Sequence, residues 1–320
     1  YQDPVATMLN AVLVTNDDGP DSPLALPFIE ALSSTLSPRE LRIVLPDTEQ
    51  SWISQAVSRF RPIETRERRF GRHPGYVASG TPADCSSLGI HNLYGSPPDV
   101  VFSGVNLGVN AGLAFFLSSG TVGGASEAML ARIRAAAFSA EVPSHIFRTW
   151  RSGDMDELKR YTNRFRALAS AAARVAKHLV DHDAWRFASL FSVNLPWNVN
   201  DQTVLRITSL AETYFGPLFT SIGENLYQHR HEGLIVQSPE VAAAADEGEH
   251  EPREPFSVRV ATEAPWDREW SLSSSFPQDL RVVAEGCISL TPITYTVSTP
   301  FSAAGVSELE TFPAADENSE

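Results

Sequence analysis

The chain has 320 residues, 42% of them hydrophobic and 20% charged, which is ordinary for a globular protein with a large core. A net charge of −14 argues against broad binding to nucleic-acid duplexes or anionic membranes, because phosphate-rich surfaces attract basic proteins. Two cysteines supply neither a disulfide framework nor a metal-binding quartet.

Short apolar runs alternate with helical patterns along the first 140 residues, which is typical of βαβ units on a parallel sheet. We predict strands at 11–15, 41–45, 76–78, 100–102, 135–139, 187–193, 204–208 and 286–291. Helices are predicted at 24–36 and 121–134, and one long amphipathic helix at 154–180. The pattern predicts a Rossmann-like three-layer α/β/α fold with a mostly parallel sheet and a smaller C-terminal β-rich extension.

The chain is expected to divide into three parts. Residues 8–200 form the catalytic core, and residues 201–300 form an extension that completes the core and carries oligomerisation elements. Residues 301–320 are an acidic tail that we expect to be disordered. Residues 1–7 resemble a tag remnant ahead of a start at Met8, and no run of 18 apolar residues exists, so we expect a cytoplasmic protein.

Two adjacent carboxylates, Asp17 and Asp18, follow the apolar run 11–15 directly. Open α/β folds bind ligands at the carboxyl ends of their strands, which is where this pair is expected to lie. Two unpaired acids there would repel one another, and a hard divalent cation such as Mg²⁺ or Mn²⁺ would relieve the cost. An Asx-turn that caps the next helix is the alternative interpretation of Asp-Asp-Gly alone.

Small polar residues follow two other predicted strands and open one helix at the same edge. Ser51 and Asn106 offer neutral oxygens that can complete a cation site, and Asn110 can donate to a phosphate. Ser119-Gly120-Thr121 opens the helix at 121–134, where unpaired backbone N–H groups and the helix dipole favour an anion. A cation beside an anion cradle indicates phosphoryl transfer or phosphate hydrolysis. Each feature alone also fits a helix cap or a tight turn.

The order and spacing of these motifs resemble the survival protein SurE family of metal-dependent phosphatases and nucleotidases. The matching segments are Val-Thr-Asn-Asp-Asp-Gly at 14–19, Pro-Asp-x-x-x-Ser at 46–51, Ser-Gly-Thr-Pro-Ala-Asp-Cys at 79–85, Pro-Asp-Val-Val-Phe-Ser-Gly-Val-Asn-x-Gly-x-Asn at 98–110 and Ser-Gly-Thr-Val at 119–122. Weaker matches follow at 193–196 and 285–292. The resemblance is strong over residues 9–140.

The resemblance implies a divalent metal ion, Mg²⁺ or Mn²⁺, held by Asp17, Asp18, Ser51 and Asn106. It implies phosphate contacts from Asn16, Asn110, Ser119, Gly120 and Thr121. The implied substrate is a small phosphorylated molecule such as a nucleoside monophosphate, and the implied assembly is a homodimer or homotetramer. Asp17 and Asp18 are the expected catalytic pair, and whether one of them acts as nucleophile or base stays open.

Trp52 stands where the family usually has a small residue, and with Phe115 and Phe116 it is expected to reshape the mouth of the site. His229 and His231 are interpreted as exposed side chains rather than a metal pair. Two other functions compete with hydrolysis. A receiver-like domain would need a lysine at a later strand end, and we find none there. A catalytically weak nucleotide- or phosphate-binding protein that keeps the fold is the second.

Overall fold

The computed structural model of the chain describes residues 8–229, 234–236 and 277–294. Its strands are β1 (Ala11–Thr15), β2 (Glu40–Pro46), β3 (Thr65–Phe70), β4 (His73–Ala78), β5 (Val100–Leu107), β6 (Arg134–Ala140), β7 (Leu190–Leu195), β8 (Leu205–Ile207), β9 (Thr213–Phe215), β10 (Phe219–Gly223), β11 (Leu226–His229), β12 (Leu234–Val236) and β13 (Ile288–Ile293). Its helices are α1 (Ala25–Leu36), α2 (Pro82–His91), α3 (Leu113–Ser118), α4 (Gly120–Leu130), α5 (Ser144–Arg151), α6 (Met155–Leu158), α7 (Thr162–Asp181) and α8 (Asp279–Ala284), with 3-10 turns η1 (Lys159–Tyr161) and η2 (Ala184–Arg186). The tag-like residues 1–7 and the acidic tail 301–320 lie outside the described residues.

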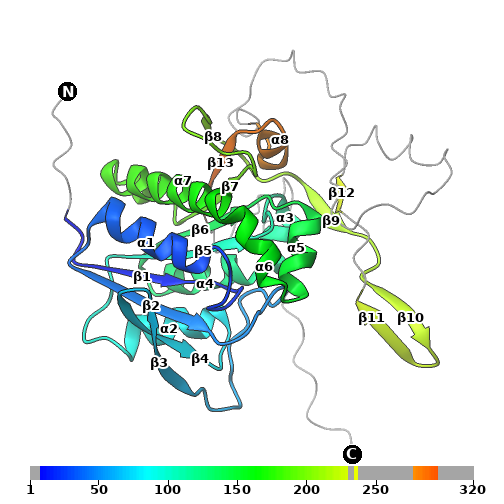
Figure 1. Ribbon diagram of the computed structural model, residues 1–320, viewed down its shortest axis with the longest axis horizontal. Coiled ribbons are helices and arrows are strands. Elements are labelled where there is room, and N and C mark those ends of the chain that lie inside the picture. Colours follow the sequence, from blue (N-terminus) through cyan, green and yellow to red (C-terminus); the bar gives the residue numbers. More distant parts are fainter. Residues whose placement is uncertain (1–7, 230–233, 237–276, 295–320) are drawn as a thin grey trace, which may run out of the picture.

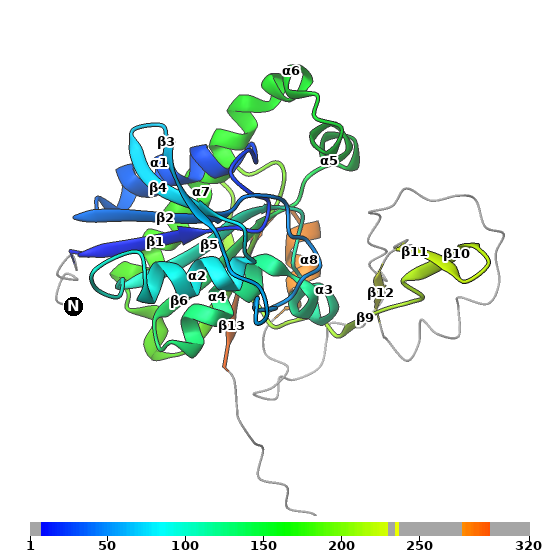
Figure 2. The same cartoon turned by 90° about the horizontal axis from the view of Figure 1, so that it is seen from below.

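One nine-stranded sheet runs through the protein in the order β3-β4-β2-β1-β5-β6-β7-β13-β8. The six strands from β4 to β7 in this order are parallel, while β3 and β13 pair antiparallel with β4 and β7. Helices α1 and α7 cover one face of the sheet, and α2 and α4 cover the other (Figures 1 and 2). The predicted three-layer α/β/α class with a mostly parallel sheet is therefore confirmed.

The alternating side chains of β1 show how the sheet is held between its helices. Val12 and Val14 belong to the core that also contains residues of α1 and α7, whereas Leu13 belongs to the core with α2 and α4. All five residues of β1 are buried, as expected for a central parallel strand with helices on both faces. The central position of β1 delivers Asp17 and Asp18 to the middle of the carboxyl edge.

The predicted single helix at 154–180 is wrong. The chain forms the short helix α6, the 3-10 turn η1 and then the long helix α7. Leu158 is buried in the core, while Tyr161 packs on Trp197 with ring centroids 6.2 Å apart. The backbone tightens between these two anchors, because tertiary packing outweighs an uninterrupted helical pattern. Helices α5 and α6 consequently extend outward beyond the carboxyl edge of the sheet (Figure 2).

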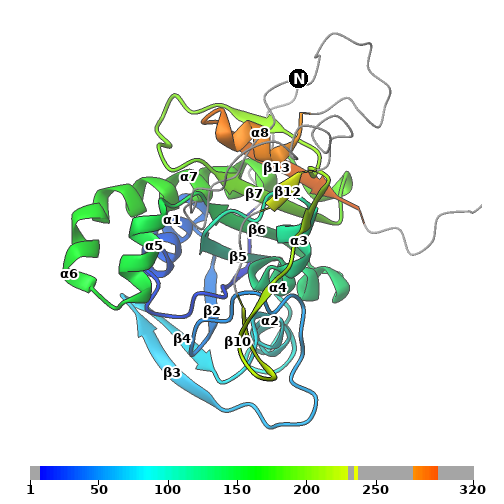
Figure 3. The ribbon, with the colours of Figure 1, turned by 90° about the vertical axis from the view of Figure 1, so that its right-hand side faces the viewer.

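The hairpin of β10 and β11 projects away from the sheet (Figures 1 and 2). Seen from that side, β10 lies in front of α2 and α4 (Figure 3). The sequence did not predict this hairpin, nor the hairpin of β3 and β4 at the far end of the sheet. Within the described residues, none of the helices combines the length and the apolar character that crossing a bilayer requires.

Candidate active site

The turn after β1 is held by a side chain that the sequence assigned to phosphate binding. Asn16 donates from Nδ2 to the Gly19 carbonyl at 2.9 Å, and its Oδ1 accepts from the Gly19 N–H at 3.1 Å. Gly19 has φ +80°, a left-handed conformation that glycine adopts without strain. Asn16 therefore fixes the turn that presents the two aspartates.

Asp17 is joined to the first turn of α4 over a separation of 104 residues. The Thr121 N–H donates to Asp17 Oδ2 at 2.9 Å, and the Thr121 hydroxyl donates to Oδ1. Gly120 makes this approach possible, because a Cβ atom at that position would lie 2.9 Å from the Asp17 Cβ. The acidic pair and the Ser-Gly-Thr turn thus meet at one point.

Asp18 faces the end of β5. Its Oδ2 accepts from the Leu107 N–H at 2.9 Å and from the Ser22 hydroxyl at 3.5 Å. The ladder between β5 and β6 shifts register between Ser103 and Asn106, where Gly104 has φ +130° and lies against β6. A Cβ at Gly104 would stand 2.2 Å from the Phe138 carbonyl oxygen, so only glycine fits this bulge. The bulge turns Asn106 and Leu107 toward the aspartate loop.

A cavity of about 620 Å³ opens at this edge of the sheet. The predicted site residues that line it are Asp17, Ser51, Asn106, Asn110 and Ser119. Asn16, Asp18, Gly120 and Thr121 are not among its lining residues; their contacts place them around Asp17 and the strand ends. The predicted residues therefore divide into a group that faces the cavity and a group that supports it.

The remaining polar side chains of this group are also fixed. The Asn106 amide donates to the Gly108 carbonyl at 2.7 Å, which leaves its Oδ1 as the acceptor available to the cavity. Asn110 is held by Asn194, whose Oδ1 accepts from the Asn110 N–H at 2.8 Å, and by Ser139. The Ser119 Oγ caps α4 by accepting from the Val122 N–H at 3.1 Å, and its own hydroxyl proton is still available.

The sequence did not predict an ion pair that lies at the cavity. Arg151, the last residue of α5, donates from Nη1 to Glu49 Oε2 at 2.8 Å, and both side chains line the cavity. Glu49 Oε1 also accepts from the Ser51 N–H at 2.8 Å. Glu49 follows β2 in the same way that Asp17 follows β1, so its position at a strand end was a usable signal. Nothing in the sequence indicated Arg151.

The charges around Asp17 leave negative charge uncompensated. Burial, with a smaller contribution from Glu49, raises the pKa of Asp17 to about 6 against the lowering effect of the Thr121 hydrogen bonds. Burial and then the neighbouring Asp17 raise the pKa of Asp18 well above its ordinary value. A divalent cation would remove this penalty, and the oxygen atoms of Asp17, Ser51 and Asn106 suit such an ion. Within the described residues, no group of three or more His, Cys, Asp or Glu is close enough to hold a metal ion, so a cation at this position would need neutral oxygens as well as carboxylates.

The raised pKa of Asp17 predicts how the metal-free protein depends on pH. Its ordinary pKa is 3.8 and its folded value is about 6, so the folded state binds this proton more tightly than the unfolded chain. The contribution of this group to stability is complete below pH 4 and is lost as pH rises through 6, by about 3 kcal/mol. Relative to Asp17→Asn, the chelator-treated wild type should lose that much free energy of unfolding between pH 4 and pH 7.5.

Urea unfolding at several pH values, followed by circular dichroism, measures this difference. Added Mn²⁺ at pH 7.5 should restore the stability of the wild type and leave the Asn variant unchanged, because binding to the native state stabilises it. A difference that is flat between pH 4 and pH 7.5 would show that Asp17 titrates normally.

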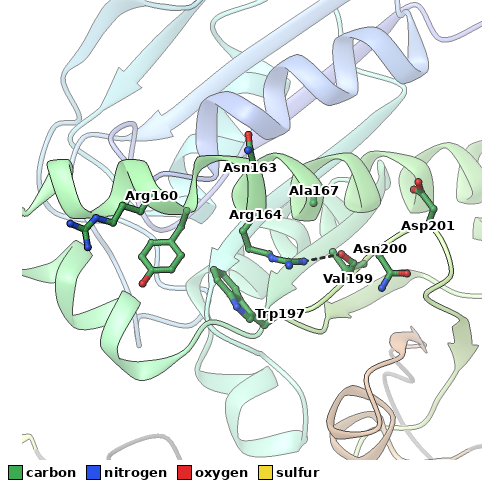
Figure 4. A pocket seen from close by; sticks show the side chains of 9 residues that line it. Arg160, Asn163, Arg164, Ala167, Trp197, Val199, Asn200 and Asp201 are labelled. Atoms are coloured by element: carbon green, nitrogen blue, oxygen red, sulfur yellow. Dashed lines mark hydrogen bonds between the residues drawn. The ribbon is translucent and has the colours of Figure 1, made fainter.

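A second cavity, of about 660 Å³, lies between α7 and the loop after β7. Figure 4 shows Arg164 donating to the Val199 carbonyl, at 3.1 Å, and the same guanidinium lies 5.9 Å from the centre of the Trp197 ring. The central cation of this cavity is therefore already engaged, and the cavity has no buried carboxylate comparable with Asp17. The cavity at the strand ends is therefore the candidate active site.

The family model described as "Survival protein SurE" matches residues 12–217. A 5'-nucleotidase SurE of Methanocaldococcus jannaschii is 33% identical over 205 residues, covering 64% of this chain and 73% of that protein. A 5'-nucleotidase SurE 1 of Thermus thermophilus is 35% identical over 225 residues, covering 67% and 82%. The crystal structure of a SurE protein from Aquifex aeolicus matches with a TM-score of 0.61 and 23% identity, over 90% of this chain and 94% of that one, which supports the fold.

Proposed function

The chain belongs to the survival protein SurE family, and from this premise we propose that it is a metal-dependent phosphomonoesterase that hydrolyses nucleoside monophosphates or related phosphate esters. One observation carries the proposal. Asp17 and Ser119, from loops far apart in the sequence, line one cavity, and Thr121 next to the Ser119 cap donates to Asp17. Relatives with 30–35% identity bear the name 5'-nucleotidase SurE, which supports a nucleotide as substrate.

We assign the metal to Asp17, Asp18, Ser51 and Asn106, with Mg²⁺ or Mn²⁺ as the ion. When bound, the ion supplies positive charge that stabilises a phosphoryl oxygen and lowers the pKa of a water molecule. Without it, Asp17 and Glu49 at the cavity would repel a phosphate dianion. Of the two aspartates, only Asp17 lines the cavity, so we assign the contact with the reacting groups to Asp17 and leave Asp18 as a metal ligand alone.

The phosphate is assigned to the side of the cavity formed by Asn110 and Ser119. The Ser119 hydroxyl and the Gly120 N–H provide hydrogen-bond donors there, whereas the Thr121 and Val122 N–H groups already donate to Asp17 and Ser119. A helix N-terminus also favours an anion. Arg151 can exchange its partner Glu49 for a phosphate oxygen, as arginine binds both groups well. Asn16 and Thr121, whose side chains are engaged with Gly19 and Asp17, are positioning residues in this proposal.

A phosphate-release assay tests the proposed function. We expect phosphate to be released from nucleoside 5'- or 3'-monophosphates with Mg²⁺ or Mn²⁺, and release to fall to background with excess chelator and to return when metal is added back. Sugar phosphates and polyphosphate belong in the same screen. Release that survives the chelator would overturn the metal requirement.

A catalytically weak nucleotide- or phosphate-binding protein is the second candidate, favoured by Trp52 at the cavity, where the family usually has a small residue. Nucleotide binding in the complete absence of turnover with either metal would select it. A homodimer or homotetramer is also proposed, because the β10–β11 hairpin exposes four large apolar side chains: Phe219, Ile222, Leu226 and Tyr227. The cytoplasmic location stays a prediction.

A further inference from the structure

Aromatic side chains from four separate segments gather at the mouth of the cavity. Trp52 comes from the loop after β2, Phe115 from α3, Phe215 from β9 and His229 from the end of β11. The centroid of the Trp52 ring lies 4.8 Å from Phe215, 4.8 Å from His229 and 6.0 Å from Phe115. Phe115 and Phe215 also meet, at 5.5 Å. We call these four residues the aromatic wall.

The aromatic wall is continuous with the proposed phosphate site. Trp52, Phe115 and His229 line the same cavity as Asp17 and Ser119. Trp52 directly follows Ser51, a proposed metal ligand, and Phe115 lies on the short helix that leads into the Ser119 cap. A phosphate ester bound at Ser119 would therefore have aromatic surface within reach of its leaving group.

The backbone at Trp52 adopts a strained conformation that holds the ring in this position. Trp52 has φ +63°, a left-handed conformation that a large side chain rarely adopts and that costs about 1–2 kcal/mol. Ser54 fixes the loop in this shape, since its N–H donates to the Ser118 carbonyl at 3.0 Å and its hydroxyl to the Leu117 carbonyl at 2.7 Å. The Trp52 side chain is nevertheless 38% exposed, so burial in a core does not explain the strain.

We propose that the aromatic wall is a subsite for the planar aromatic part of the leaving group, a nucleobase or an aryl ring, and that Trp52 is its main specificity-determining residue. The inference rests on the proposed function, which it deepens by naming the part of the substrate that is recognised. Aromatic rings bind one another through stacked or edge-to-face contacts, and such contacts tolerate any base because every base has a π-face. The wall offers few hydrogen-bonding groups, so it selects for aromatic character rather than for one base.

Substituting Trp52 tests the wall by comparing substrates within each variant. Trp52→Gly removes the ring and suits the left-handed backbone, while Trp52→Phe keeps a smaller ring. The rates are measured on AMP, p-nitrophenyl phosphate and ribose 5-phosphate with saturating Mn²⁺. We expect the ratio of kcat/KM for AMP to that for ribose 5-phosphate to fall about tenfold in the Gly variant, as for one lost base stack, and less in the Phe variant. The ratio of kcat/KM for p-nitrophenyl phosphate to that for ribose 5-phosphate should also fall.

Phe60→Ala is the matched control, because Phe60 is 90% exposed and does not line the cavity. The proposal would be overturned if all rates fell together in Trp52→Gly, with the ratio of kcat/KM for AMP to that for ribose 5-phosphate within twofold of the wild-type ratio. The aromatic wall would then have only a structural role. If the wild type hydrolyses none of the three substrates, the proposed function is wrong, but the subsite can still be tested by calorimetric binding. The wild type must then bind AMP more tightly than ribose 5-phosphate, and Trp52→Gly must lose that preference.

Discussion

Asp17→Asn should lower metal-dependent phosphate release by more than about a hundredfold while the protein stays folded. The reason is that Asn keeps the shape of Asp17 but loses the charge that the cation and the reacting water need. Its Oδ1 can still accept from the Thr121 N–H, and its amide can donate to the Thr121 hydroxyl, so the contact with α4 survives. Removing a buried charge whose pKa is raised also costs the metal-free fold nothing at neutral pH.

The measurement is kcat/KM with Mn²⁺, together with thermal unfolding of the chelator-treated protein at pH 7.5. Asp99→Asn is the matched control, because Asp99 accepts from the Ala11 N–H at 3.0 Å at the opposite end of the same strand. Asn keeps an acceptor for this N–H but loses the charge, so the change should lower stability slightly and leave kcat/KM of the folded protein near that of wild type. Full activity in Asp17→Asn would show that the reaction does not need the Asp17 carboxylate. A melting temperature well below that of wild type would instead show that Asp17 mainly stabilises the fold.

The sequence predicts best where a strand is buried on both faces and ends abruptly. The run 11–15 matches β1 residue for residue, because apolar side chains on both faces and the Asn-Asp-Asp-Gly turn define its limits. The same reasoning located Ser51, Asn106 and Asn110 at one edge, since parallel strands end at the same side of a sheet. The ends of the central strands thus carry most of the predictable part of the candidate site.

Sequence reasoning could not predict which atoms of these residues would already be engaged. Asn16 and Thr121 were expected to contact phosphate, but one holds Gly19 and the other donates to Asp17. The contact between Thr121 and Asp17 depends on side-chain orientation across 104 residues, which no local pattern encodes. The contact between Asn16 and Gly19 spans only three residues, so a turn interpretation of this segment could have found it. The Glu49–Arg151 pair and the aromatic wall were not predictable for a similar reason. Tertiary packing alone brings α5 and β9–β11 to the cavity.

The loop that carries Ser51 and Trp52 owes its position to a glycine on a neighbouring helix. Gly123 lies in α4, and a Cβ atom there would stand 2.1 Å from the Ser54 carbonyl oxygen and 2.6 Å from the Ser54 carbonyl carbon. Real contacts of a Cβ with backbone atoms are longer than 3 Å, so the loop must move by about 1 Å to admit a methyl group. Alanine by itself suits a helix better than glycine by up to about 1 kcal/mol, so α4 should persist.

Gly123→Ala is therefore expected to displace the loop and lower kcat/KM by about ten- to a hundredfold, because misplacing a site residue by an ångström has effects of that size. The loss should extend to ribose 5-phosphate as well as AMP, and the Mn²⁺ concentration for half-maximal activity should rise, since Ser51 moves with the loop. Steady-state kinetics and a Mn²⁺ titration measure both effects, with circular dichroism to establish that the variant is folded.

Gly95→Ala serves as the control, because no atom lies within 4 Å of a Cβ at that position and its activity should not change. Ser54→Ala provides a milder test of the same loop, since it deletes the hydrogen bond to the Leu117 carbonyl without adding a clash, and it should shift metal affinity in the same direction. If both Gly123→Ala and Ser54→Ala keep wild-type kinetics and metal affinity, the reaction does not depend on this loop. The assignment of Ser51 as a metal ligand would then be wrong.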